Sequence, residues 1–227
     1  MITTLSPRPL PLKGRWRIEP LWCGETVFIV AGGPSLRGVN LDCLKGRKVI
    51  AVNSSYEKVP FADLLFFGDA RWWTDHADKL KKFSGRIVTC SGAVSSDKLL
   101  KLRRVVPGNG SPGFAEDRDA TASQRTSLQG AMNIASHLGA RREVLLGADM
   151  GRASDGASHH HSKHRWPVRQ GNVTWNEQMS HLKLIVEPLA KRKVEVINTS
   201  LVSRIPWWPK MSLTDFLAKE KIEQEES

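Results

Sequence analysis

Residues 26–36, TVFIVAGGPSL, decide the fold of this chain. The first six of them form a short, continuous apolar run closed by Gly32 and Gly33. A run of that length that ends in glycines is typical of a strand buried on both faces, as in a parallel sheet. Pro34 suits the first turn of a helix, where its missing N–H does no harm. The stretch therefore predicts a strand, a glycine turn and the start of a helix.

Similar apolar runs recur along the chain. We expect further buried strands at residues 48–53, 63–69, 85–90, 143–149 and 193–198. Residues 127–138 have near-helical apolar spacing and are followed by Gly139, which favours a helix end. Residues 176–192 are also expected to be helical, with a kink or break at Pro188. Strands alternating with helices predict a single-domain α/β fold, a Rossmann-like and mostly parallel sheet with helices on both faces.

The chain divides into three parts in this interpretation. Residues 1–24 form an N-terminal arm, residues 25–205 the Rossmann-like domain, and residues 206–227 a C-terminal segment with a charged helix. Within the domain, residues 107–125 are rich in Gly, Pro, Ser and Asp and are expected to form a mobile loop. Residues 151–173 are expected to form a polar, His-rich loop.

Composition limits the class of protein. The 227 residues allow one substantial core, and no apolar run approaches the ~20 residues that cross a bilayer. The N-terminus lacks an apolar signal core, and the three cysteines show no CxxC spacing, so we expect a cytoplasmic protein. The net charge of +11 favours phosphorylated ligands, or is simply a solvated basic surface. The sequence indicates no oligomeric state.

Two common nucleotide-binding motifs are missing. The turn AGGPSL lacks the GxGxxG spacing of a dinucleotide site, and Asn53 stands where an NAD-binding strand normally ends in an acid. No GxxxxGK[ST] sequence occurs, which excludes a P-loop. Dehydrogenases and P-loop kinases are therefore disfavoured.

Polar residues follow several of the predicted strands. In parallel α/β sheets, ligands bind outside the carboxyl ends of the strands, which is where Asn53, Asp69 and Asp149 are expected. Asp69 with the nearby Arg71 suits Mg²⁺ or a substrate phosphate, and Asp149 is a second acid for a metal–phosphate site. The alternative is that these residues cap helices or turns.

The stretch His159–His164, HHHSKH, holds four of the seven histidines. We favour a general base or a phosphate-binding loop, since histidine titrates near neutrality. His161 and His164 are the preferred bases, with His160 next and Lys163 beside an anionic substrate. A structural zinc site would need ligands from elsewhere, and a basic loop without a chemical role is the remaining alternative.

Several motifs occur in a family-like order: VFIVAGGPSL, AVNSS, FFGDARWW, TSLQGAMNIASHLGARREVLLGADM and HHHSKH. This series resembles the 6-hydroxymethylpterin diphosphokinase family (MptE-like proteins), most of all its bacteriophage-type members. It is also similar to the family-42 bacterial sialyltransferases, which use a CMP-sugar donor. The resemblance spans roughly residues 26–205.

The resemblance implies roles for single residues. Asn53 would contact the donor nucleotide, Ser127 would lie in the nucleotide pocket, and a loop histidine would act as base toward the acceptor hydroxyl. Asp69 departs from the sialyltransferases and looks like the acid of the phosphokinase and phage branches, where Mg²⁺ is expected. The nucleotide-phosphate turn would be formed by Gly32, Gly33, Pro34 and Ser35, with the Ser35 hydroxyl as a donor.

The sequence thus predicts a nucleotide-dependent, glycosyltransferase-like transferase. It would use a nucleotide-activated donor (a nucleotide sugar or nucleoside triphosphate), with Mg²⁺ as a candidate cofactor, and an acceptor hydroxyl. The phage-like resemblance and the basic charge add DNA as a partner, with modified bases as the acceptor. Two alternatives stay open: a Mg-dependent diphosphokinase acting on a hydroxymethyl group, and a nucleotide- or DNA-binding protein without catalysis.

Overall fold

The computed structural model describes residues 15–108, 113–161 and 172–225. Its centre is a seven-stranded sheet, parallel throughout, with the strand order β5-β4-β3-β2-β1-β8-β9. This confirms the predicted Rossmann-like α/β fold. The strands are β1 (Thr26–Val30), β2 (Lys48–Val52), β3 (Leu64–Phe67), β4 (Arg86–Thr89), β5 (Leu99–Lys101), β8 (Arg142–Leu146) and β9 (Glu195–Asn198).

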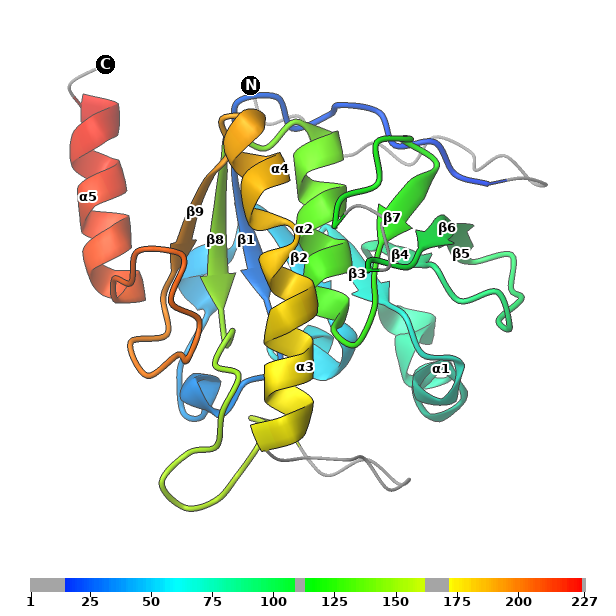
Figure 1. Ribbon diagram of the computed structural model, residues 1–227, viewed down its shortest axis with the longest axis horizontal. Helices are drawn as coiled ribbons and strands as arrows, with labels where there is room; N and C mark the ends of the chain where they lie inside the picture. Colours follow the sequence, from blue (N-terminus) through cyan, green and yellow to red (C-terminus); the bar gives the residue numbers. More distant parts are fainter. Residues whose placement is uncertain (1–14, 109–112, 162–171, 226–227) are drawn as a thin grey trace.

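Helices cover both faces of the sheet, as predicted. Figure 1 shows α2 (Ser127–Leu138), α3 (Asn172–Lys183) and α4 (Val186–Lys191) in front of one face. The other face is covered largely by short elements and by the C-terminal helix, which the sequence also predicted. These are the 3-10 helices η1 (Pro34–Leu36), η2 (Asp42–Leu44), η3 (Asn53–Glu57) and η4 (Lys79–Lys82), and the α-helices α1 (Ala70–His76) and α5 (Leu213–Glu225).

Two apolar layers hold these helices on the sheet. Side chains alternate along a strand, so Val27 and Ile29 of β1 pack with the α2 face while Phe28 packs on the opposite face. There Phe28 meets Phe216 of α5 edge to face, with 5.9 Å between ring centroids. The continuous apolar run that opens the domain is therefore explained by burial on both sides.

The strand order reverses at β1. From β1 the chain adds β2, β3, β4 and β5 in one direction, and later adds β8 and β9 on the other side of β1. Connections that leave neighbouring strands in opposite directions open a crevice at the carboxyl ends, which is the usual ligand position in such sheets. Here that crevice lies between the residues that follow β1 and those that follow β8.

The expectation of a loop over residues 107–125 is wrong for its second half. Strand β7 (Ala120–Ala122) pairs with β6 (Arg103–Val105) in a small separate parallel sheet. The fully buried Asn133 of α2 stabilises this segment: its Oδ1 accepts hydrogen bonds from the backbone N–H groups of Ala115 and Ala122, both at 2.8 Å. The partner lies outside the segment, so local composition could not reveal it.

The helix predicted for residues 176–192 is interrupted between Lys183 and Val186, slightly before Pro188. Helix α3 ends at Lys183, and Pro188 is the third residue of α4, where a missing N–H costs no intrahelical bond. The described part of the predicted N-terminal arm also belongs to the core, because Trp16, Ile18 and Trp22 are buried. Within the described residues, no helix has the length and apolar character needed to span a bilayer.

Candidate functional site

A cavity of about 400 Å³ opens at the carboxyl ends of the central strands, and we call it the switch-point cavity. It brings together most of the residues predicted from the sequence. These are Gly32, Gly33, Asn53, Asp69, Arg71, Ser127, Asp149 and His161. Pro34, Ser35 and His160 are not part of the lining, and Lys163 and His164 lie outside the described residues.

The glycine turn is held by bonds within the protein. The Gly33 N–H donates to the Gly147 carbonyl at 2.8 Å. Ser35 donates twice to the Asp149 carboxylate, from its backbone N–H and from its hydroxyl, both at 2.7 Å. The Ser35 donors that the sequence assigned to a phosphate are therefore already bonded to a carboxylate, and a carboxylate repels phosphate. The turn forms a wall of the cavity, and the hydrogen-bond donors for a bound phosphate must come from other residues.

Gly33 is required by this arrangement. A Cβ at that position would lie 2.4 Å from the Gly147 carbonyl oxygen and 2.5 Å from the Asp149 carboxylate. Gly147 itself has a φ of 65°, in the left-handed region that favours glycine. Gly33 and Gly147 therefore allow the turn that follows β1 (the β1 turn) and the turn that follows β8 (the β8 turn) to lie in contact at the crevice.

The amino terminus of α2 supplies donors for an anion. Thr126 is the N-cap and its side chain accepts from the Leu128 N–H, while Ser127 begins the helix. All three residues line the cavity. The first N–H groups of a helix have no intrahelical acceptor and carry partial positive charge, which favours a bound anion.

Arg104 brings a full positive charge to the same cavity. Its guanidinium donates to the Gly68 carbonyl and, at 3.3 Å, to the Cys90 sulfur, and neither acceptor is a carboxylate. Within the described chain, no ion pair joins Arg104 to a carboxylate. We call the α2 amino terminus with Arg104 the anion corner. The sequence analysis did not single out Arg104.

Backbone strain also gathers around this cavity. Asn53, Arg125 and Met150 have φ angles of 51°, 62° and 52°, and all three line the cavity. Only one other described non-glycine residue, Lys193, has a positive φ. Such conformations cost free energy and cluster at ligand sites, so their position supports a binding role for the cavity.

Asp69 and Arg71 form a pair at the rim. Asp69 is the N-cap of α1 and accepts from the Arg71 backbone at 2.9 Å and from the Arg71 guanidinium at 2.6 Å. These hydrogen bonds lower the pKa of the Asp69 carboxyl, so it is ionised near neutrality. Asp69 therefore orients Arg71 toward the cavity.

The donor set does not fit a divalent cation. The oxygens of Asp69 are bonded to Arg71 and those of Asp149 to Ser35. In the ranges that the structure describes, no group of three His, Cys, Asp or Glu side chains is placed to ligate a metal. The metal role predicted for Asp69 and Asp149 finds no support in this geometry, and we derive no step through Mg²⁺.

Three described histidines of the His-rich loop, His159, His160 and His161, do not all face the cavity. His159 and His161 line the cavity and stack on each other, with ring centroids 4.8 Å apart. His160 points away: its backbone N–H donates to the Gly32 carbonyl at 3.1 Å, and its Nε2 lies 3.2 Å from the Ser55 hydroxyl. The backbone bends at His160 and His161, so neighbouring rings of this stretch point to different sides. His160 therefore anchors the loop, and His159 takes the place in the cavity that the sequence analysis gave to His160.

His160 gives the anchor a defined pH range. Burial, with the nearby charges of His161 and Lys58, lowers the pKa of the His160 ring from 6.5 to about 4. The ring is therefore neutral at pH 7.

We expect His160 to make the protein sensitive to acid. A base with a lowered pKa in the folded state contributes stability that is complete above pH 6.5 and is lost as the pH falls toward 4. Between pH 7 and 4.5, urea denaturation should show the wild type losing about 1–2 kcal/mol more unfolding free energy than His160→Gln, after allowance for solvent screening. Equal slopes for the wild type and His160→Gln would contradict the assignment.

Fold and site together define a Rossmann-like α/β protein with a cationic cavity at the switch point of its sheet. Comparison with protein-family profiles finds no match, and comparison with curated protein sequences finds none either. Among solved structures, the chain is similar to the sialyltransferase CstII from Campylobacter jejuni in complex with a substrate analogue, cytidine-5'-monophosphate. The TM-score is 0.47 at 14% identity, over 84% of this chain and 86% of that chain.

Proposed function

We propose that this chain is a nucleotide-dependent, glycosyltransferase-like transferase that moves a group from a nucleotide-activated donor to an acceptor hydroxyl. The observation that carries the proposal is one cavity that holds both an anion corner and a histidine pair. Group transfer from a nucleotide needs both functions, because a phosphate leaves while a hydroxyl loses its proton. A simple nucleotide-binding protein needs only the first.

The donor would lie along the cavity from the glycine turn to α2. Gly32 and Asn53 border the nucleoside, and the phosphate meets the Ser127 end of α2 and Arg104. As the bond between the transferred group and the phosphate breaks, negative charge grows on the phosphate oxygens. Fixed positive groups at that point stabilise the transition state more than the ground state.

The acceptor hydroxyl would be deprotonated by His161. Its ring lines the cavity and stacks on His159, and the His160 anchor fixes the loop that carries both. The hydroxyl oxygen bonds to the transferred group, the donor phosphate departs with the bonding pair, and the proton passes to His161. His164 and Lys163 keep their predicted roles as a second base and an anion contact. Among the described residues that line the cavity, no contact specifically favours a DNA acceptor or diphosphate transfer.

A donor-turnover assay tests this proposal. With CMP-, UDP- and ADP-based donors, His161→Ala should lower kcat by roughly 100-fold or more with little change in KM, as for loss of a general base. Arg104→Gln should raise KM and lower kcat together, because the phosphate contact persists into the transition state. Arg17→Gln removes the same charge from an exposed position outside the cavity and is the control.

The outcomes separate the alternatives. Nucleotide binding without turnover of any donor would favour the non-catalytic binding protein. If His161→Ala and His164→Ala both kept wild-type turnover, the base would be assigned wrongly while the transferase proposal stood.

A further inference from the structure

A second cavity, of about 1000 Å³, lies at the amino ends of the strands, opposite the switch-point cavity. Thr26, Lys48 and Arg142, the first residues of β1, β2 and β8, contribute to its lining. We call it the basal cavity. Its walls carry five cationic side chains and the carboxylate of Glu25, and one of the cations, Lys45, is paired with Asp42 at 2.8 Å. The cations are Lys45, Arg47, Lys48, Arg141 and Arg142.

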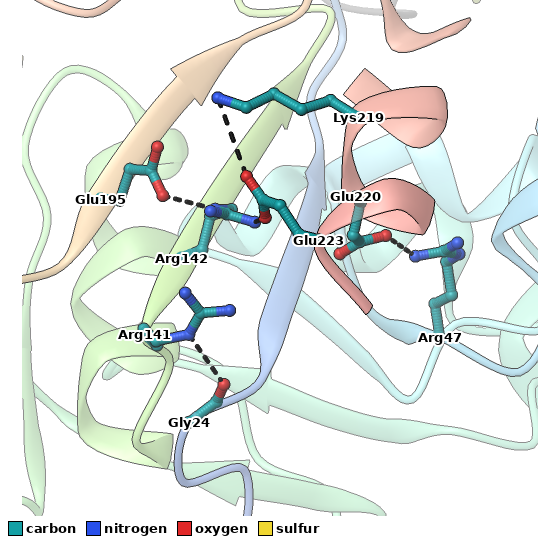
Figure 2. Close-up of polar contacts among 8 residues, drawn as sticks. All are labelled: Gly24, Arg47, Arg141, Arg142, Glu195, Lys219, Glu220 and Glu223. Carbon is teal, nitrogen blue, oxygen red and sulfur yellow. Dashed lines mark hydrogen bonds and ion pairs between the residues drawn. The ribbon is translucent and has the colours of Figure 1, made fainter. Parts of the chain in front are cut away.

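Two glutamates of α5 enter this basic region, as Figure 2 shows. Glu220 pairs with Arg47, and its carboxylate is almost fully buried. Glu223 pairs with Arg142 at 3.0 Å. The contacts lower the pKa of the Glu223 carboxyl, through its bond to Arg142 and through the further charges of Lys219 and Arg141. The chain therefore already places anionic groups of its own among these cations.

Arg141 differs from the other two arginines. Figure 2 shows its one dashed contact, from Nε to the Gly24 carbonyl at 3.4 Å. Among the described residues it forms no ion pair, in contrast to Arg47 and Arg142. An exposed guanidinium with free terminal N–H groups at the wall of a cationic cavity is suited to bidentate binding of a phosphate.

We propose that the basal cavity binds a polyphosphate anion, held chiefly by Arg141 with Arg47 and Lys45 beside it. The cavity is larger than one small ion needs, and its lining has more cationic than anionic side chains, which suits an anion with several phosphates. The carboxylates of Glu25, Glu220 and Glu223 in the lining, and Asp42 on Lys45, limit the affinity because they compete for the same cations. The site is distinct from the switch-point cavity, since the two share no lining residue and lie at opposite ends of the strands.

Calorimetric titration with inorganic tripolyphosphate tests the proposal. The full chain is used at low salt with Arg104→Gln in the background, so that the anion corner does not contribute. Arg141→Gln should weaken binding roughly tenfold, as for loss of one charge-assisted pair, whereas Arg17→Gln should change it little. A parallel titration with ATP shows whether the source of the phosphates is a nucleotide or an inorganic chain.

A variant that is expected to bind tripolyphosphate more tightly completes the test. Glu223→Gln removes a competing carboxylate and should tighten binding several-fold, whereas Glu225→Gln, which pairs with Lys221 outside the cavity, should not. Equal affinities for Arg141→Gln and Arg17→Gln, or weaker binding by Glu223→Gln, would overturn the proposal. Because the Arg104→Gln background disables the switch-point cavity, these results do not depend on the proposed transferase activity.

Discussion

Gly33→Ala is expected to destabilise the protein by about 1–3 kcal/mol and to weaken donor binding. The new Cβ would lie within 2.5 Å of the Gly147 carbonyl oxygen and the Asp149 carboxylate, and Asp149 is buried. Neither group is a flexible chain end, so the β1 turn must separate from the β8 turn. That movement breaks the bonds from Ser35 to Asp149 and changes the cavity wall.

The neighbouring glycine is the matched control. A Cβ on Gly32 would meet His159 Nδ1 and His161 Nε2 at 3.5 Å, which is ordinary van der Waals contact. Gly32→Ala should therefore change the unfolding free energy by less than about 0.5 kcal/mol in urea denaturation. If the two alanine variants had equal stability, the close approach of the two turns would be refuted.

Glu143→Met is expected to stabilise the protein by about 1–3 kcal/mol at pH 7. Glu143 lies on β8, opposite Val27 of β1 and Val196 of β9, and is fully buried. Neither carboxyl oxygen has a hydrogen-bond partner among the described residues. Methionine has a similar shape and removes the unsatisfied polar group.

The same carboxyl predicts a pH dependence. Burial raises the pKa of Glu143 well above its ordinary value, so the folded protein holds a proton that the unfolded chain releases above about pH 4.5. Stability must therefore fall as the pH rises from 4.5 toward the folded pKa. His160 acts in the opposite direction below pH 6.5, and only the difference from a variant isolates Glu143.

Denaturation at pH 5 and pH 8 separates the two effects of this carboxyl. Glu143→Gln should abolish its contribution to the pH slope but keep the cost of a buried polar group, whereas Glu143→Met should remove both. A destabilised Glu143→Met would show that the carboxyl makes a stabilising contact.

The sheet was predictable because its signal is local. The apolar residues within 26–31 and 143–149 are typical of strands that are buried on both faces, and polar residues that follow parallel strands lie at the same end of the sheet. This brought Asn53, Asp69 and Asp149 to a single cavity, as expected.

The remaining features depend on contacts between distant residues. Arg104 reaches the cavity from β6, whose partner strand β7 donates a backbone hydrogen bond to Asn133 of α2. The Ser35 donors are taken by Asp149, more than one hundred positions away, which no local pattern shows. His160 leaves the cavity because it bonds to Gly32 and Ser55, which are more than one hundred positions away, so the sequence could not show that His159 lines the cavity in its place.

The most direct test of the central claim is a calorimetric titration with CMP-, UDP- and ADP-based ligands on the wild type, Arg104→Gln and Arg17→Gln. We predict that one nucleotide class binds saturably, and that Arg104→Gln weakens it by roughly tenfold or more while Arg17→Gln does not. Absence of binding by all three classes, or equal binding by Arg104→Gln and the wild type, would contradict a nucleotide phosphate at the anion corner.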